Sequence, residues 1–185
     1  MSAAHPYHRL EVPVEVPFEL RSSPGKGWGA FATKHIDRGS LILSEKPTFI
    51  IRKSHNEITD YHVTMAFQKL SPSQRAQFLL LRDNGTSYFT SMNDAFAENS
   101  FNIANSDRDE PEAHGLFPLH SRFNHSCIPN SKVPTVSGEI ISSFAIRDID
   151  VGLDMSGIKL YVLPAIAWPV YLAPPFNSLV TCDGD

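Results

Sequence analysis

The sequence predicts an α+β domain that is rich in β-structure, with a helical insert and an irregular, proline-rich C-terminal tail. Three observations support this prediction. Short segments of alternating or β-branched residues stand at both ends of the region 18–155, an apolar spacing of helical period occupies its middle, and prolines interrupt residues 156–185. A chain of 185 residues, 42% of them hydrophobic, is long enough for one domain with its own core.

The first elements are predicted to be extended. Residues 1–17 form a lead-in in which prolines stand among alternating valines and glutamates, a pattern typical of polyproline backbone or an edge strand. Residues 18–21 alternate apolar and polar side chains, residues 22–25 predict a turn, and residues 30–33 predict a return to extended backbone. Residues 40–45 are apolar and partly β-branched, which predicts a buried strand.

Helices are predicted within an insert at about residues 54–114. An amphipathic stripe at i, i+3, i+4 and i+7 is formed by Val63, Ala66, Phe67 and Leu70. Ser71-Pro72-Ser73-Gln74 combines a capping hydroxyl, an early proline and a glutamine at the third helical position, which predicts a helix over 76–82. Residues 95–97 and 101–103 fit either a short helix or a strand, and their pattern leaves both open.

Strands are predicted again towards the C-terminus, at 132–133, 139–141 and 143–146. The most apolar stretch of the chain, residues 160–176, is shorter than the roughly 20 residues that cross a bilayer and contains several prolines. It is therefore not predicted to span a membrane.

Charge and cysteine content exclude several classes of protein. The net charge of -4 and the lack of a run of like charges argue against direct nucleic-acid binding and against a polybasic membrane anchor. The first residues lack the apolar segment of a secretory signal, so we expect a nuclear or cytoplasmic protein. In such a compartment Cys127 and Cys182 are predicted to be free thiols.

A glycine-rich loop, Gly25-Lys26-Gly27-Trp28-Gly29, is the first segment that could hold a ligand. Its glycines permit positive φ and a close approach of the backbone to a ligand, and Trp28 offers a flat apolar face. The spacing differs from that of phosphate-binding loops, and no helix is predicted after it. By local chemistry alone a plain turn is the more common interpretation of such a segment, and Trp28 fits a core position as well as a ligand site.

The second such segment is Ser121 to Asn130, which contains Asn124-His125-Ser126-Cys127. Asparagine and histidine offer hydrogen-bond donors and acceptors in both side chain and backbone, which suits a polar ligand. The same residues also suit a hydrogen-bonded turn beside a core strand, and local chemistry does not separate these interpretations.

Both segments resemble signatures of the SET domain family of protein lysine methyltransferases. Residues 122–130 spell the pattern Arg-Phe-Asn-His-Ser-Cys-x-Pro-Asn, and residues 25–32 are similar to the family's opening cofactor loop, in the same order along the chain. Residues 36–47 are similar to the strand that follows that loop, and the helical insert matches the split arrangement of some members. The resemblance covers about residues 18–152 and implies small curved sheets in a SET domain at 18–155.

The resemblance also implies a cofactor, S-adenosylmethionine, and a protein or peptide lysine as substrate. The positions that match the cofactor-binding motifs are Lys26, Gly27, Trp28, Gly29, Arg122, Asn124 and His125. The glycine-rich loop is expected to contact the methionine end of the cofactor, largely through its backbone. The asparagine and histidine are expected to hold its amino and adenine portions. These roles require the two segments to converge on one cleft.

The sequence departs from the family after Gly152. Leu153-Asp154 stands where two glutamates belong, and Lys159 stands where the catalytic tyrosine belongs. Tyr161 comes two residues late, which keeps the face of a strand but moves the side chain by roughly 6 to 7 Å. Two hypotheses therefore stay open: a methyltransferase with Tyr161 as its tyrosine, and a truncated or inactive SET module that binds cofactor or protein.

A metal site is not predicted. Members of the family use the cysteine of the Asn-His-Ser-Cys run together with a downstream group of three cysteines to bind zinc. Here Cys182 is the only other cysteine, so four cysteine ligands cannot be assembled. Recruitment of His120 and His125 beside Cys127 is the less favoured alternative.

Overall fold

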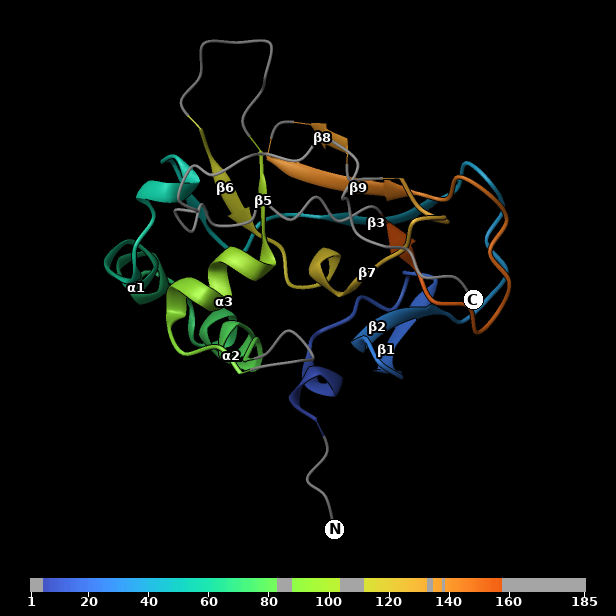
Figure 1. Ribbon diagram of the computed structural model, residues 1–185, viewed down its shortest axis with the longest axis horizontal. Coiled ribbons are helices and arrows are strands. Elements are labelled where there is room, and N and C mark those ends of the chain that lie inside the picture. The colour runs from blue at the N-terminus through green and yellow to red at the C-terminus, as the bar shows by residue number, and fades with distance from the viewer. Residues whose placement is uncertain (1–4, 83–87, 104–111, 133–134, 138, 158–185) are drawn as a thin grey trace, which may run out of the picture.

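The computed structural model describes residues 5–82, 88–103, 112–132, 135–137 and 139–157. Several small sheets and a group of three helices make up this part of the chain, with the helices gathered on one side of the molecule and the first hairpin on the other (Figure 1). The arrangement is α+β and rich in short strands, as the sequence predicts.

The first hairpin joins β1 (Phe18–Ser23) to β2 (Gly27–Ala32) in antiparallel register, from Phe18 opposite Ala32 to Ser23 opposite Gly27. The connection is short because Gly25 and Gly27 both adopt positive φ, at 73° and 77°. Strand, turn and strand are thus confirmed, with the turn slightly later than predicted.

A second sheet has the order β3-β9-β8, with β3 at Leu41–Glu45, β9 at Ile140–Phe144 and β8 at Thr135–Ser137. The two strands predicted at 139–141 and 143–146 form one strand here. Side chains along β9 alternate between buried and half-buried, so Ile141 and Ser143 both face the interior. The gap between the two predicted strands falls at the half-buried Ser142, through which β9 continues without interruption.

A third sheet, of order β4-β6-β5, borders the helices. Its strands are β4 (Ile50–Ile51), β6 (His114–Leu116) and β5 (Ser100–Asn102). The segment that sequence left undecided contains both kinds of structure, because α3 (Met92–Asn99) runs directly into β5. Residues 95–97 are therefore helical and residues 101–102 belong to a strand, with the boundary between Asn99 and Ser100.

The helices α1 (Asp60–Gln68) and α2 (Pro72–Leu80) precede α3. The helix start predicted at Ser71 is confirmed, since its hydroxyl accepts a hydrogen bond from Gln74 N at 3.3 Å and Gln74 Oε1 accepts one from Ser71 N at 3.0 Å. The helix ends two residues before the predicted position. No helix in the described ranges is both long and apolar enough to cross a bilayer.

Part of the lead-in packs against the domain instead of extending along a sheet edge. Residues Pro6–Arg9 form a 3₁₀ helix, η1, which the His5 side chain caps by accepting from Tyr7 N at 3.3 Å. Tyr7 and Leu10 are buried. The predicted extended backbone is wrong for this turn, because a proline after a capping side chain also favours the start of a helix.

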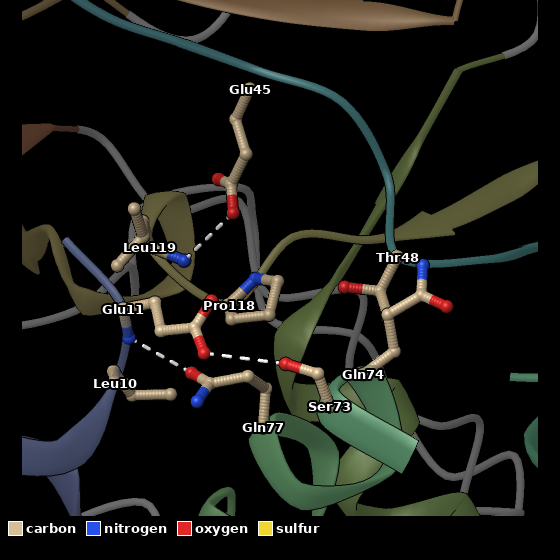
Figure 2. Close-up of a pocket in the computed structure, with 9 residues that line it drawn as sticks. All are labelled: Leu10, Glu11, Glu45, Thr48, Ser73, Gln74, Gln77, Pro118 and Leu119. Carbon is tan, nitrogen blue, oxygen red and sulfur yellow. Dashed lines mark hydrogen bonds between the residues drawn. The ribbon is translucent and has the colours of Figure 1, made fainter. Parts of the chain in front are cut away.

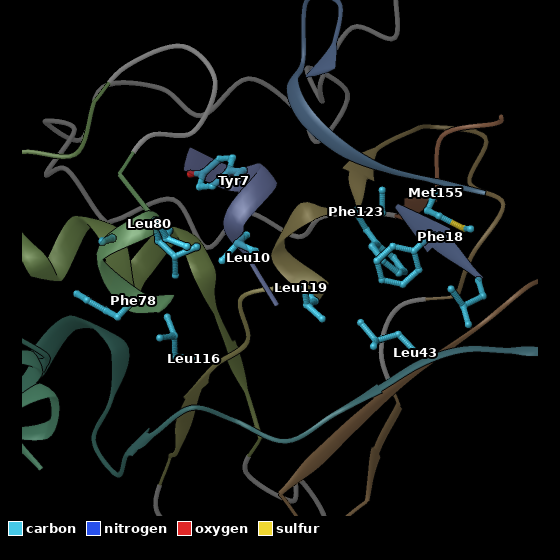
Figure 3. Packing of buried hydrophobic residues seen from close by; sticks show 14 of the residues in the cluster. Tyr7, Leu10, Phe18, Leu43, Phe78, Leu80, Leu116, Leu119, Phe123 and Met155 are labelled. Carbon is cyan, nitrogen blue, oxygen red and sulfur yellow. The ribbon is translucent and has the colours of Figure 1, made fainter. Parts of the chain in front are cut away.

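The main core runs continuously from the helices to the first hairpin. Figure 3 shows Phe78, Leu80 and Leu116 at one end of this cluster and Phe18, Phe123 and Met155 at the other. The ring of Phe18 meets that of Phe123 edge-on, with centroids 5.6 Å apart. The core therefore joins the first hairpin to the segment that carries the asparagine and histidine.

Candidate functional site

The glycine-rich loop and the Asn-His segment meet at Gly29 and Asn124. Gly29 in β2 is buried, and a Cβ added to it would lie closer than 3.0 Å to Asn124 Nδ2 and 2.8 Å from Asp154 Oδ1. Only a residue without a side chain allows β2 to approach Asn124 and Asp154 this closely. The expected convergence of the two segments is observed, and at this point they are in direct contact.

Residues 153–157 hold the two segments together. Ala32 N donates to Leu153 O at 2.9 Å and Met155 N donates to Ala30 O at 2.6 Å, which attaches this stretch to β2. On its other side, β10 (Ser156–Gly157) pairs in parallel with β7 (Asn124–His125). The segment that departs from the family in sequence thus lies between the two motifs and is bonded to both.

Asparagine side chains fix this arrangement. Asn124 Nδ2 donates to Asp154 Oδ2 at 2.8 Å. Asn130 Nδ2 donates to Asp154 O at 2.7 Å, and Asn130 Oδ1 accepts from Ser156 N at 2.8 Å. Both asparagines are buried, so each of these bonds is shielded from water. Sequence reasoning missed the role of Asp154, since nothing in its surroundings marks it as a partner of Asn124.

The tip of the first hairpin is the accessible part of the site. Lys26 is exposed, and Gly27 and Trp28 are half-buried. On the other motif, His125 is half-buried and its Nε2 lies 3.6 Å from Cys127 Sγ. The residues that can reach a ligand are therefore a cation, a glycine backbone and two aromatic rings.

Cys127 is disulfide-bonded in the structure, so the prediction of a free thiol at this position is wrong. The prediction used the usual redox state of cysteines in such a compartment, which does not decide the state of one particular cysteine. Cys182 lies outside the described residues, as do Lys159 and Tyr161, so the role predicted for Tyr161 stays a prediction.

Arg122 is buried, with 7% of its surface exposed. It follows Ser121 in the 3₁₀ helix η3 (His120–Arg122). Its guanidinium donates to Asn99 Oδ1 and to Ser121 Oγ, and its Cζ lies 4.3 Å from the centre of the Tyr7 ring. These contacts direct the group into the protein, which favours a supporting role over direct contact with a ligand.

A hydrogen-bonded pair, the half-buried Glu45 and the buried His120, was not found from sequence. Glu45, at the end of β3, accepts from His120 Nδ1 at 2.7 Å through Oε2. The same carboxylate accepts from the backbone N–H groups of Leu119 at 3.0 Å and His120 at 2.9 Å. It therefore fixes the turn that leads into η3 and on to Asn124.

A cavity of about 260 Å³ lies beside this carboxylate (Figure 2). It is bordered by the lead-in, by α2 and by the turn before η3. The residues that line it are Leu10, Glu11, Glu45, Thr48, Ser73, Gln74, Gln77, Pro118 and Leu119. It does not include the residues predicted to bind the cofactor.

His120 is not available as a metal ligand through Nδ1, because that atom is bonded to Glu45. Within the described ranges, His35, Asp37 and Asp148 form the one group of three side chains with metal-ligand spacing, and all three are exposed. This group lies outside the two motifs.

Residues 27–155 match the family model of the SET domain. The chain belongs to the SET domain family. The match includes Gly27 to Gly29 and all of the Asn-His segment. No curated protein matches the chain. Among solved structures, the chain is similar to a proposed histone methyltransferase from Plasmodium falciparum, with 15% identity, coverage of 78% of this chain and 94% of that chain, and a TM-score of 0.46.

The family assignment rests on the sequence match, and the distant structural likeness adds nothing to it. Within the SET domain, the described structure brings Gly29 of the loop against Asn124 of the signature and places residues 153–157 beside both. The positions predicted for cofactor binding thus belong to one connected region, while Arg122 points away from its accessible part.

Proposed function

We propose that this SET domain binds S-adenosylmethionine and transfers its methyl group to a lysine side chain of a protein or peptide. The observation that supports this most directly is the contact of Gly29 with Asn124, because it joins the two motifs that the family uses for its cofactor. Membership of the SET domain family supports this reaction class.

The accessible groups fit the charges of this cofactor. Its methionine end carries a carboxylate, and Lys26 presents an exposed ammonium at the tip of the hairpin. Gly27, with φ of 77°, lets the backbone approach a ligand without a side chain in the way. The half-buried ring of His125 offers a flat face for the adenine portion, and the half-buried Trp28 stands beside Gly27 at the end expected to hold the methionine portion.

The chemistry needs alignment more than it needs a strong acid or base. S-adenosylmethionine supplies a methyl group on a positively charged sulfur, which a neutral amine attacks in line. An unperturbed lysine has a pKa of about 10.4, so the site must favour the neutral amine by excluding water. The protein's part is to hold the two reactants in line and to keep solvent out.

A second function, binding without turnover, is favoured by one specific observation. Leu153 and Asp154 lie beside β2 at the positions where the family has two glutamates, and Lys159 stands at the position of the expected tyrosine. Under this alternative the motifs still form a cofactor site, because the backbone pairing of residues 153–157 persists. Tyr161 then has no catalytic role.

Calorimetry with S-adenosylmethionine tests the shared part of both functions. Lys26→Ala is expected to weaken binding several-fold through loss of a charge contact, whereas Lys34→Ala, which removes another exposed lysine near the far end of β2, is expected to have no effect. A folded wild-type chain that gives no binding heat would refute cofactor binding.

A methyl-transfer assay then separates the two functions. Transfer of labelled methyl groups to a lysine-rich protein, lost in Tyr161→Phe, supports the methyltransferase with Tyr161 as its tyrosine. Transfer that persists in Tyr161→Phe eliminates that residue. Binding of cofactor without any transfer favours the inactive module.

A further inference from the structure

Residues 5–11 lie across the domain between the first hairpin and the helical insert, and we call them the N-terminal strap. At one end the His5 ring stacks on Trp28, with centroids 5.1 Å apart and an interplanar angle of 27°. At the other end, Glu11 N donates to Gln77 Oε1 at 2.9 Å, and Ser73 Oγ donates to Glu11 Oε1 at 3.3 Å. The strap therefore connects a candidate cofactor residue to α2.

Tyr7 is the buried centre of the strap, with 1% of its surface exposed. Its ring meets Trp28 edge-on, with centroids 6.3 Å apart. The Arg122 guanidinium lies over the same ring, 4.3 Å from its centre, and bonds to Asn99 at the end of α3. One ring thus contacts a residue of the glycine-rich loop and a residue of the Asn-His segment.

Contacts of this kind set orientation. The stacked ring of His5 and the edge-on ring of Tyr7 together fix the plane of the Trp28 ring. The guanidinium of Arg122 is fixed in direction because it is held over the face of the Tyr7 ring. The cavity of Figure 2 lies beneath the other end of the strap, next to Leu10 and Glu11. The strap is thus closely packed around Tyr7 and loosely packed near α2.

We propose that His5 and Tyr7 position Trp28 for the cofactor and hold Arg122 in its supporting role, so that the N-terminal strap is a working part of the site. The inference rests on the proposed binding of S-adenosylmethionine. His5 and Tyr7 act through their neighbours and are positioning residues. Tyr7 sets the directions of Trp28 and Arg122 together, and His5 covers the outer face of Trp28.

The test compares Tyr7→Phe with Tyr7→Leu. Phenylalanine keeps the aromatic ring, whereas leucine keeps the apolar bulk but has no aromatic ring. Calorimetry should give an affinity for S-adenosylmethionine close to that of the wild type for Tyr7→Phe and about tenfold weaker for Tyr7→Leu. Tyr61→Leu, at an exposed position of α1, is the matched control and should bind normally.

A second readout follows Trp28 itself. In a Trp168→Phe background, Trp28 is the chain's remaining tryptophan, and its quenching by acrylamide reports its exposure. Tyr7→Leu should increase the quenching and Tyr7→Phe should not. His5→Ala, which removes a half-buried ring and keeps the Tyr7 side chain, should increase the quenching and weaken binding by about threefold. The His5→Ala variant therefore tests the inference even if Tyr7→Leu does not fold.

The outcomes separate this inference from the function on which it rests. Normal binding by folded Tyr7→Leu, or normal binding by His5→Ala, overturns it, as does an equal defect in Tyr7→Phe and Tyr7→Leu. If the wild-type chain binds no S-adenosylmethionine, the proposed function fails. Unchanged quenching of Trp28 in the strap variants would then also overturn the positioning role, and increased quenching would support it.

Discussion

Asn124 donates a hydrogen bond from Nδ2 to Asp154 Oδ2 at 2.8 Å, across 30 positions of the chain. Gly29 of β2 packs directly against this pair, so the pair supports the strand that continues the glycine-rich loop. Asp154 belongs to the segment whose sequence departs from the SET family. Its carboxylate nevertheless accepts from the asparagine of the family signature, which ties the divergent segment to the site.

Replacing Asn124 with aspartate should disrupt the hydrogen bond between positions 124 and 154. Asn124→Asp removes the donor and sets two carboxylates against each other in a buried position, so we expect a loss of about 2–4 kcal/mol in the free energy of unfolding. The double variant Asn124→Asp with Asp154→Asn restores one amide opposite one carboxylate. Chemical denaturation should show partial recovery of stability in the double variant, and strictly additive losses would contradict a direct interaction.

The close approach of β2 predicts a cost for any side chain at position 29. Gly29→Ala places a Cβ 2.8 Å from Asp154 Oδ1, and the crowding should destabilise the protein by about 1–3 kcal/mol and weaken cofactor binding. Gly25→Ala is the control, because it meets no atom within 4 Å and adds only left-handed strain at φ of 73°. Thermal unfolding and calorimetry measure both effects. Normal cofactor binding by Gly29→Ala would show that the contact is not needed for the site.

Glu45 should contribute more to stability than an exposed acidic residue does. Glu45→Gln removes the charge that faces His120 Nδ1 and two backbone N–H groups, and we expect a loss of about 3 kcal/mol. Glu139→Gln removes an exposed partner of Arg52, 2.6 Å away, and should cost no more than about 1 kcal/mol. Urea unfolding of both variants gives the comparison, and equal losses would refute a structural role for the buried pair.

Acid should destabilise the protein through His114. Burial lowers the pKa of His114 below 6.5, and the nearby His55 lowers this pKa further, while Glu112 opposes the shift. The folded state therefore favours the neutral ring. Stability is complete above the unfolded pKa and decreases as the pH falls towards the folded pKa, because the unfolded chain takes up the proton first.

His114→Phe removes this titration and keeps a ring beside His55, whose centroid lies 5.3 Å away. We expect the melting temperature of the wild type to fall more than that of His114→Phe between about pH 7.5 and pH 5.5. His8→Phe replaces an exposed histidine and should behave like the wild type. An equal decrease in all three proteins would assign the acid sensitivity to other groups.

Local signals in the sequence determined much of this protein. The spelling of residues 122–130 and the glycine-rich loop predicted the family, Ser71 and Gln74 predicted a helix start, and alternation predicted the first hairpin. Each of these features depends on neighbours within a few positions, through capping bonds, turn conformations or side-chain period. Such features can be inferred without knowing how distant segments meet.

Tertiary structure alone decided which distant residues became partners. Asp154 pairs with Asn124, Glu45 with His120, and Tyr7 lies over Arg122, although no local pattern marks any of these pairs. A side-chain hydrogen bond or ring contact depends on positions in space that a shared core fixes only after the chain has folded. The sequence thus identified the motifs, and the packing of the core selected the residues that support them.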